Sequence, residues 1–232
     1  MVTSAYPDLK FRTVEGAQLG TSDRAAMFAL FDVAYRDANH AYLEKSFGTL
    51  RWVALAWHES TLAGFSLAES RILDLPRLPA AVVHLAGICC IAPEFRRRHL
   101  FVALERMAGL LPDGSPLDRS DVRSLGCGRM AHPASFRGMT RIPSVVPKPG
   151  VAPTAWQQEV GQAIAGAYGV PDFDPRTFVC HGTGVPIGYP VIDMDVTPGE
   201  WEVFRQVNRD RGDSLLGIAW MPDAPPGWDD RP

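Results

Sequence analysis

One segment near the middle of the chain limits what the chain can fold into more than any other. An apolar run over residues 81–91 has the composition of a strand, and it leads into the turn Pro93-Glu94-Phe95. Three arginines follow, and apolar residues then recur at helical spacing from Leu100 onward. The pattern predicts a strand that passes through a short basic turn directly into a helix over residues 98–110.

This arrangement makes an anion site from its own parts. The first N–H groups of a helix lack partners within the helix, and the helix dipole places partial positive charge there. Backbone N–H groups near residues 97–102 are therefore expected to hold a pyrophosphate, with Arg96, Arg97 and Arg98 supplying charge around it. The alternative is a strand, loop and helix with a solvated basic turn.

The same residues carry a family resemblance. The segment is similar to the acyl-CoA signature of the GNAT superfamily, Val-x-Pro-Glu-Tyr-Arg-Gly-x-Gly-[Ile/Leu]-[Gly/Ala], and His99 and Phe101 stand where the family has small residues. Glycine at such places permits close approach of the backbone to a ligand. The residues that fit the pattern are Ile91, Pro93, Glu94, Phe95, Arg96, Arg98 and Leu100.

The resemblance implies acetyl-CoA or another acyl-CoA as co-substrate, with pantetheine lying between two strands that splay apart. It assigns three groups to the coenzyme. Pantetheine would contact the backbone of Cys89, Cys90 and Ile91, and His132 would lie beside the thioester. The pyrophosphate would contact the turn and the start of the helix, which comprise Arg96, Arg97, Arg98, His99, Leu100, Phe101 and Val102.

Acyl transfer to an amine needs a base that keeps the attacking nitrogen neutral. The candidates are His84, Glu69 and His132. Each has an ordinary alternative: a structural histidine within a strand, the solvated end of a hairpin strand, and a simple helix start. The resemblance also implies a tyrosine acid on the helix after His132, but Met139 occupies that position.

Hydrophobic periodicity gives the order of the other elements. The sequence predicts an α/β fold with a GNAT-like mixed central sheet flanked by helices, in a single domain over 1–232 with a core over about 11–142. Strands are expected over 11–14, 51–57, 62–72, 124–130, 191–196 and 214–221, and helices after a cap at Ser22 or Asp23, over 39–47, after His132, over 154–168 and after Thr197.

Residues 143–221 form an extension that completes the sheet and exceeds what the acyltransferase core needs. Its helix over 154–168 and a loop from His181 to Pro190 predict a pocket that selects the acceptor. The side chains expected there are Trp156, His181, Tyr189 and Asp193. Cover for a sheet edge or a dimer contact is the alternative.

Composition excludes several classes of protein. The 232 residues carry a net charge of -3, which gives no reason to expect a nucleic-acid partner. The four cysteines, Cys89, Cys90, Cys127 and Cys180, have no zinc-site spacing, and no metal is expected. Neither a membrane-spanning run nor a signal peptide is evident, so we expect a cytoplasmic protein without a membrane partner.

The leading hypothesis is therefore an acyl-CoA-dependent N-acyltransferase that acetylates the amine of a small metabolite by direct transfer in a ternary complex, in a monomer or a homodimer. A non-catalytic acyl-CoA-binding or protein-interaction module on the same scaffold is the alternative. A third hypothesis is another thioester reaction, hydrolysis or O-acylation.

Overall fold

The computed structural model describes residues 6–116, 122–184, 189–191 and 195–230. The chain forms two compact units. The first comprises Met1–Ser70 and Leu85–Leu117, and the second comprises Arg71–His84 and Asp118–Pro232. The predicted boundary between core and extension at residue 142 does not coincide with the boundary between the two units, because the residues on both sides of 142 belong to the second unit. The single-domain assignment stays a prediction.

The secondary structure confirms the predicted α/β class: a mixed sheet is flanked by helices. Among the described residues the large sheet has the strand order β1-β3-β4-β5-β6-β10-β8-β7. The strands are β1 Lys10–Glu15, β2 Tyr35–Arg36, β3 Trp52–His58, β4 Thr61–Leu75, β5 Leu78–Ile91, β6 Ser124–Met130, β7 Phe173–Asp174, β8 Val179–Cys180, β9 Tyr189–Pro190 and β10 Ser214–Met221. The α-helices are α1 Thr21–Ala34, α2 His40–Thr49, α3 Leu100–Ala108, α4 Pro133–Thr140 and α5 Ala155–Ala167, and short 3-10 helices cover Gly16–Gln18, Pro93–Phe95, Glu202–Phe204 and Arg209–Arg211.

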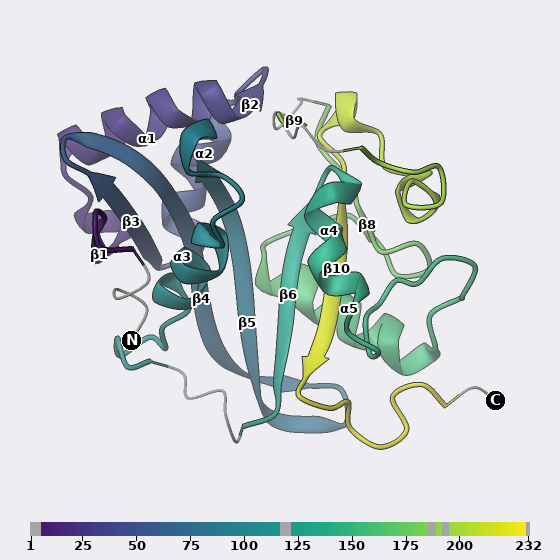
Figure 1. The fold of residues 1–232 in the computed structure, drawn as a ribbon. Coiled ribbons are helices and arrows are strands. Elements are labelled where there is room, and N and C mark those ends of the chain that lie inside the picture. Colours follow the sequence, from purple (N-terminus) through teal and green to yellow (C-terminus); the bar gives the residue numbers. More distant parts are fainter. Residues whose placement is uncertain (1–5, 117–121, 185–188, 192–194, 231–232) are drawn as a thin grey trace. The chain divides into compact units, whose positions relative to one another are not determined.

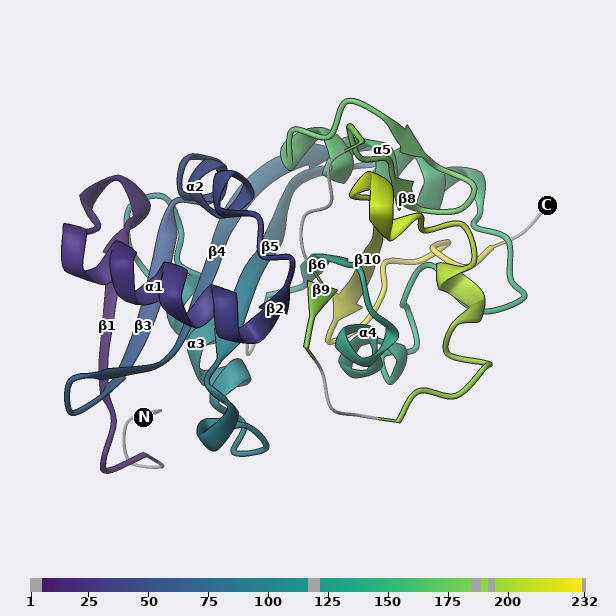
Figure 2. The same ribbon diagram turned by 90° about the horizontal axis from the view of Figure 1, so that it is seen from above.

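In the first unit, small side chains let α3 lie close to the sheet. A Cβ added at Gly64 in β4 would lie only 3.0 Å from Leu104 Cδ1 of α3. On the opposite face, a Cβ at Gly87 in β5 would meet Leu50, the residue that ends α2, and Leu67. Helices α2 and α3 therefore lie on opposite sides of these strands (Figure 2). The residues packed around α3 on its face include Ala54, Ala56, Ala63, Ala68, Leu100, Ala103 and Leu104.

Polar contacts fix α3 along its length. The Ser66 hydroxyl donates to the Glu105 carboxylate. Near the end of the helix, the Ser70 hydroxyl donates to the Gly109 carbonyl at 2.9 Å. The start of the helix is thereby held at one place beside the end of β5, where the candidate site begins.

In the second unit, β10 pairs antiparallel with β6 on one side and β8 on the other. Helix α4 packs on β10 (Figure 1), since a Cβ at Gly217 would lie 2.8 Å from Phe136 Cε2 and 3.0 Å from Met139 Sδ. Helix α5 begins at a capping box in which Thr154 and Gln157 bond each other's backbone N–H groups.

Most predicted elements are found within a few residues of their expected bounds, and three local expectations are wrong. Gly20, rather than Ser22 or Asp23, caps α1. Strand β5 begins at Leu78, so Pro79 lies within it. The helix expected after Thr197 is a turn followed by a 3-10 helix, because Gly199 favours a turn and the Glu200 carboxylate is drawn to Arg137. The strand expected over 191–196 includes residues 192–194, which lie outside the described residues.

The described chain beyond Pro222, up to residue 230, is anchored in the second unit. Trp228 is 1% exposed, and its indole N–H donates to the Ser144 carbonyl at 3.0 Å. The amide of Gln157 donates to the Trp228 carbonyl at 2.9 Å. The end of the described chain is therefore part of the core of the second unit.

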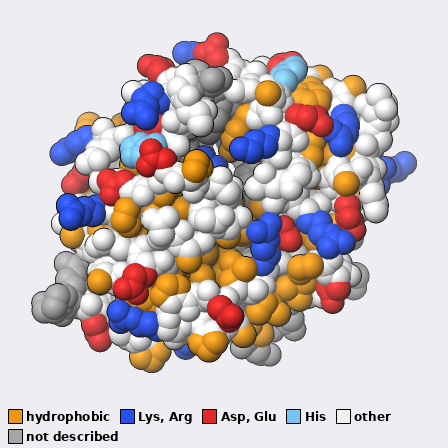
Figure 3. All heavy atoms as spheres, turned by 180° about the vertical axis from the view of Figure 1, so that it is seen from behind, with side chains coloured by type: hydrophobic (Ala, Val, Ile, Leu, Met, Phe, Trp, Pro, Cys, Tyr) orange, Lys and Arg blue, Asp and Glu red, His pale blue; other side chains and the backbone are white. Residues whose placement is uncertain are grey.

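The face shown in Figure 3 carries charges of both signs. Lysine and arginine side chains are interspersed with aspartate and glutamate there, without a continuous basic stripe. Among the described residues, no helix is long and apolar enough to span a bilayer.

Candidate functional site

The turn between β5 and α3 is held by its own hydrogen bonds. The Ala92 N–H donates to the Ala63 carbonyl of β4 at 2.9 Å, and the 3-10 turn Pro93–Phe95 follows. Arg96 folds back, so that its Nε donates to the Ile91 carbonyl at 3.1 Å. Arg96 therefore braces the turn, and the carbonyl of Ile91, one of the backbone groups predicted to meet pantetheine, accepts this bond.

Two residues of the turn adopt backbone conformations that favour glycine. Arg97 has φ 63°, and His99 has φ 59° and ψ 15°. Both stand where the GNAT pattern has glycine. A side chain with a Cβ in this left-handed region costs about 1–2 kcal/mol. The chain thus adopts left-handed backbone conformations at two positions of the turn without having glycine at either.

The left-handed His99 also explains why α3 begins at Leu100 rather than at Arg98 as predicted. His99 is the N-cap, and its side chain makes no capping hydrogen bond. The Val102 N–H donates to the His99 carbonyl at 3.1 Å. The N–H groups of Leu100 and Phe101 receive no side-chain cap from His99, which makes them the donors suited to a ligand. Phe101 and Val102, in the first turn, are 53% and 55% exposed.

The arginines of the turn face solvent beside a hollow in the first unit. Arg97, Arg98 and His99 are exposed. A cleft of about 490 Å³ adjoins them, and its lining includes Arg98, His99 and Leu100. Tyr6 closes one side, with its hydroxyl donating to the Arg98 carbonyl at 2.6 Å, a contact that no feature of the sequence indicated.

The other residues that line this cleft are Pro7, Asp8, Leu9 and two with rings, His58 and Phe95. The rings of His58 and Phe95 are 5.4 Å apart, and the Arg98 guanidinium lies 5.9 Å from the Phe95 ring. Positive charge, backbone donors and aromatic surface therefore meet at the start of α3. This combination suits a phosphorylated ligand that carries a flat ring.

The two cysteines at the end of β5 are not nucleophiles. Burial raises the pKa of the Cys90 thiol well above its usual value. Desolvation, and then the negative charge of Glu105, raises the pKa of Cys89 in the same way. Both thiols are therefore protonated at neutral pH, which leaves their backbone as the only part suited to the predicted contact with pantetheine.

The candidate bases in the strands are both buried. Glu69 is 7% exposed and accepts the backbone N–H of Arg51 at 3.3 Å, so it is not the solvated strand end that the sequence also allowed. His84, in the second unit, is 6% exposed. The catalytic roles of both stay predictions.

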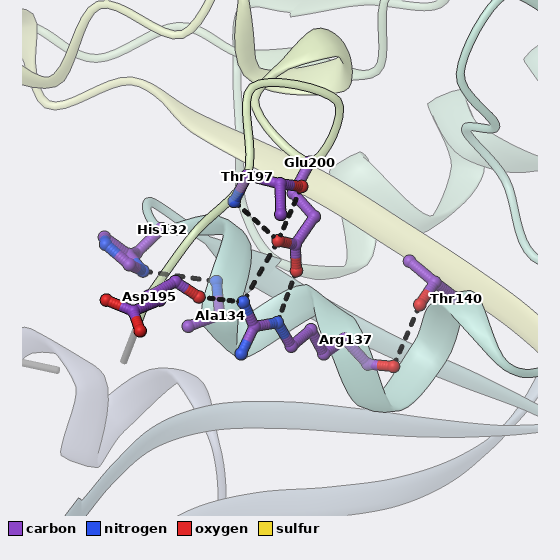
Figure 4. Close-up of polar contacts among 7 residues, drawn as sticks. All are labelled: His132, Ala134, Arg137, Thr140, Asp195, Thr197 and Glu200. Atoms are coloured by element: carbon purple, nitrogen blue, oxygen red, sulfur yellow. Dashed lines mark hydrogen bonds and ion pairs between the residues drawn. The ribbon is translucent and has the colours of Figure 1, made fainter. Parts of the chain in front are cut away.

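His132 is the N-cap of α4 (Figure 4). Its Nδ1 accepts the Ala134 N–H at 3.2 Å, and its ring makes an edge contact with Trp201, with 5.5 Å between centroids. The pKa of His132 is lowered, first by partial burial and then by the positive charges of Arg209 and Arg137. His132 is therefore neutral at pH 7, with its Nδ1 lone pair engaged.

A charged clamp holds the segment 195–204 on α4 (Figure 4). The Arg137 guanidinium donates to both oxygens of Glu200 and to the Asp195 carbonyl. Glu200 also accepts the Thr197 N–H at 2.8 Å. These hydrogen bonds, that from Arg137 foremost, lower the pKa of Glu200 to about 2. The Thr-x-x-Glu pattern indicated the Thr197 contact, but nothing in it indicated Arg137.

The residues predicted to contact the acceptor have different outcomes. Trp156 is 6% exposed and donates its indole N–H to the Pro76 carbonyl at 2.7 Å, so it is a packing residue, and its predicted role in a pocket finds no support in this geometry. His181 is partly exposed beside Asp213. Tyr189 lies in the short strand β9, and Asp193 lies outside the described residues.

Comparison with known proteins adds distant structural likenesses. No family model and no curated protein sequence matches the chain. A ribosomal-protein-S18-alanine N-acetyltransferase from Escherichia coli matches with a TM-score of 0.40 and 10% identity, over 94% of this chain and 98% of that one. A diaminobutyrate acetyltransferase from Paenibacillus lautus, solved with its substrate and coenzyme A, matches with a TM-score of 0.38 and 16% identity, over 90% and 93%.

An aminoglycoside N-acetyltransferase in complex with CoA matches over a shorter stretch. The match has a TM-score of 0.30 and 15% identity, and it spans 41% of this chain and 63% of that one. With TM-scores of 0.30–0.40 and identities of 10–16%, these similarities assign no role to this chain.

Proposed function

We propose that the chain is an acyl-CoA-dependent N-acyltransferase that transfers an acetyl group to the amine of a small metabolite. One observation carries the proposal. Arg97 and His99 hold left-handed conformations that leave the start of α3 without a side-chain cap, next to exposed arginine. A turn that accepts this strain and offers uncapped N–H groups is suited to a pyrophosphate.

In the proposed reaction, the neutral amine attacks the thioester carbonyl of acyl-CoA in a ternary complex. The N–C bond forms, the C–S bond breaks, the amine nitrogen loses one proton to a base, and the CoA thiolate leaves. The turn at Arg97 and Arg98 binds the coenzyme and takes no part in these bond changes. Specific acceptor recognition is proposed for the second unit, where His181 is partly exposed.

Binding is tested by isothermal titration calorimetry with acetyl-CoA and with S-acetylpantetheine, which lacks the pyrophosphate. The double variant R97A/R98A is expected to weaken acetyl-CoA binding by about 1–3 kcal/mol while affinity for S-acetylpantetheine stays the same. Arg96 is left in place because it braces the turn. R106A, an exposed arginine on the same helix, is the matched control.

An unchanged dissociation constant for acetyl-CoA in R97A/R98A would refute the placement. An equal loss for both ligands would point instead to a collapsed turn.

A non-catalytic binding module is a second candidate, favoured by one observation. Met139 stands at the position where the resemblance implies a tyrosine that acts as general acid. Its thioether packs on β10 and has no proton to donate. Release of free thiol from acetyl-CoA over a panel of small amines separates the two. Amine-dependent release identifies a catalyst, whereas acetyl-CoA binding without release identifies a module.

A further inference from the structure

The strained turn before α3 is held from both of its sides. On the side of the helix, the His99 carbonyl accepts the N–H groups of Val102 at 3.1 Å and Ala103 at 3.4 Å. On the side of the turn, the Arg98 carbonyl accepts the hydroxyl of Tyr6 at 2.6 Å. A left-handed residue with a Cβ persists only where its surroundings fix it, so these hydrogen bonds on either side of His99 are its supports.

Tyr6 is itself fixed by its neighbours. The Leu9 N–H donates to the Tyr6 carbonyl at 3.1 Å and closes a turn. The Tyr6 ring makes an edge contact with Phe11, with 5.8 Å between centroids, and both rings pack against the apolar cluster around α3. Phe11 lies in β1, where it pairs with Ala56 of β3. The sheet therefore sets the position from which the hydroxyl reaches the turn.

The hydrogen bond from Tyr6 also sets the direction of a backbone donor. The Arg98 carbonyl and the His99 N–H belong to one planar trans peptide, in which the two groups point in opposite directions. A hydroxyl that holds the carbonyl therefore aims the His99 N–H away from Tyr6. It also polarises the peptide, which makes the N–H a stronger donor.

The backbone around this peptide has the form of an anion site. The φ angle is positive at Arg97 and His99 but not at Arg98 between them. Such alternation of hand turns successive N–H groups toward one concave side, an arrangement found in many phosphate sites. The His99 N–H comes directly before the N–H groups of Leu100 and Phe101, which receive no side-chain cap from His99.

We propose that Tyr6 is a positioning residue for the coenzyme: its hydroxyl holds the Arg98–His99 peptide so that the His99 N–H donates to the pyrophosphate beside those of Leu100 and Phe101. This inference rests on the proposed function. Tyr6 acts through the backbone of the turn and not by contact with the ligand. Tyr6, the turn and the start of α3 all belong to the first unit.

Removal of the hydroxyl alone tests this role. Y6F keeps the ring beside Phe11 and breaks only the bond to the Arg98 carbonyl. We expect Y6F to weaken acetyl-CoA binding by about 2–10-fold in isothermal titration calorimetry, while the affinity for S-acetylpantetheine, which lacks the pyrophosphate, stays the same. Y42F is the matched control, because Tyr42 is a half-buried tyrosine of α2 in the same unit.

A second substitution separates positioning from contact with the ligand. Glycine adopts the left-handed conformation without the cost of a Cβ, so H99G reduces the need for support from Tyr6. We expect Y6F to weaken acetyl-CoA binding by less than about 2-fold when it is introduced into H99G. An equal loss in both backgrounds would mean that Tyr6 contacts the coenzyme or acts through the fold in general, and it would overturn the proposal.

Backbone ¹³C chemical shifts of His99 test the support without any ligand. We expect left-handed values in the wild type and in Y42F, and a shift toward right-handed or extended values in Y6F. Unchanged His99 shifts in Y6F, or acetyl-CoA binding as tight as that of the wild type, overturn the role of Tyr6 alone. A wild type that does not bind acetyl-CoA overturns the proposed function instead, and the chemical shifts then still decide whether Tyr6 holds the turn.

Discussion

At the scale of single residues, the turn before α3 holds a strained histidine at a glycine-like position. His99 has φ 59° and makes no side-chain capping hydrogen bond, so no such bond offsets the conformational cost of its Cβ. H99G should therefore raise the free energy of unfolding by about 0.5–1 kcal/mol. Acetyl-CoA affinity should stay the same or rise, because the backbone path is kept.

Chemical denaturation and calorimetry measure both quantities. E94G is the matched control, because Glu94 is exposed in the same turn and has an ordinary backbone conformation. It should destabilise the protein by about 0.5–1 kcal/mol. A loss of stability in H99G as well would show that the histidine side chain makes a contribution that outweighs its strain.

Only part of the candidate site could be predicted from the sequence at the level of single residues. The pattern around Arg96 located the turn, because a strand, a proline and a helical period are local signals. The bond from Tyr6 to Arg98 joins residues 92 positions apart, and no local pattern contains it. The hydrogen bond at His132 that decides its proton position depends on cap geometry, which a spacing does not specify.

At the scale of elements, the segment 195–204 is attached to α4 by the clamp between Arg137 and Glu200 (Figure 4). The pKa of Glu200 is lowered from 4.5 to about 2, so the clamp contributes stability above pH 4.5 that is lost as the pH falls toward 2. The stability difference between the wild type and E200Q should therefore be full at pH 7 and shrink across that acid range.

Thermal unfolding at a series of pH values checks this expectation, with E202Q as an exposed neighbouring control. A difference that does not vary between pH 7 and pH 3 would mean that the Glu200 charge is not what holds the segment.

The elements themselves were predictable where periodicity was strong. Strands β6 and β10 have their predicted bounds, because their apolar runs end at turn residues. The prediction of an α-helix after Thr197 was wrong. A capping pattern starts a helix only when the residues that follow it favour helical structure, and Gly199 disfavours it.

At the scale of the whole molecule, the carboxyl-terminal tail contributes to the core of the second unit. Trp228 contacts the rings of Trp156 and Trp220 at centroid distances of 5.4 Å and 5.8 Å. W228A should lower the free energy of unfolding by about 3–5 kcal/mol through the cavity it leaves. Urea denaturation measures this, and W228F should recover part of the loss. An effect below about 1 kcal/mol in W228A would mean that the tail is not part of the folded core.

The division into two units has a consequence for how the chain can be cut. The chain passes between the units inside β4, at Ser70–Arg71, and again inside β5, at His84–Leu85. No single cleavage therefore yields two intact halves, and a fragment that ends near 142 keeps β6 but loses β10, the strand that pairs along its whole length. Such a fragment would expose a bare sheet edge that can recruit other chains. Aggregation, rather than a smaller folded protein, is what trimming this chain to its expected core should produce.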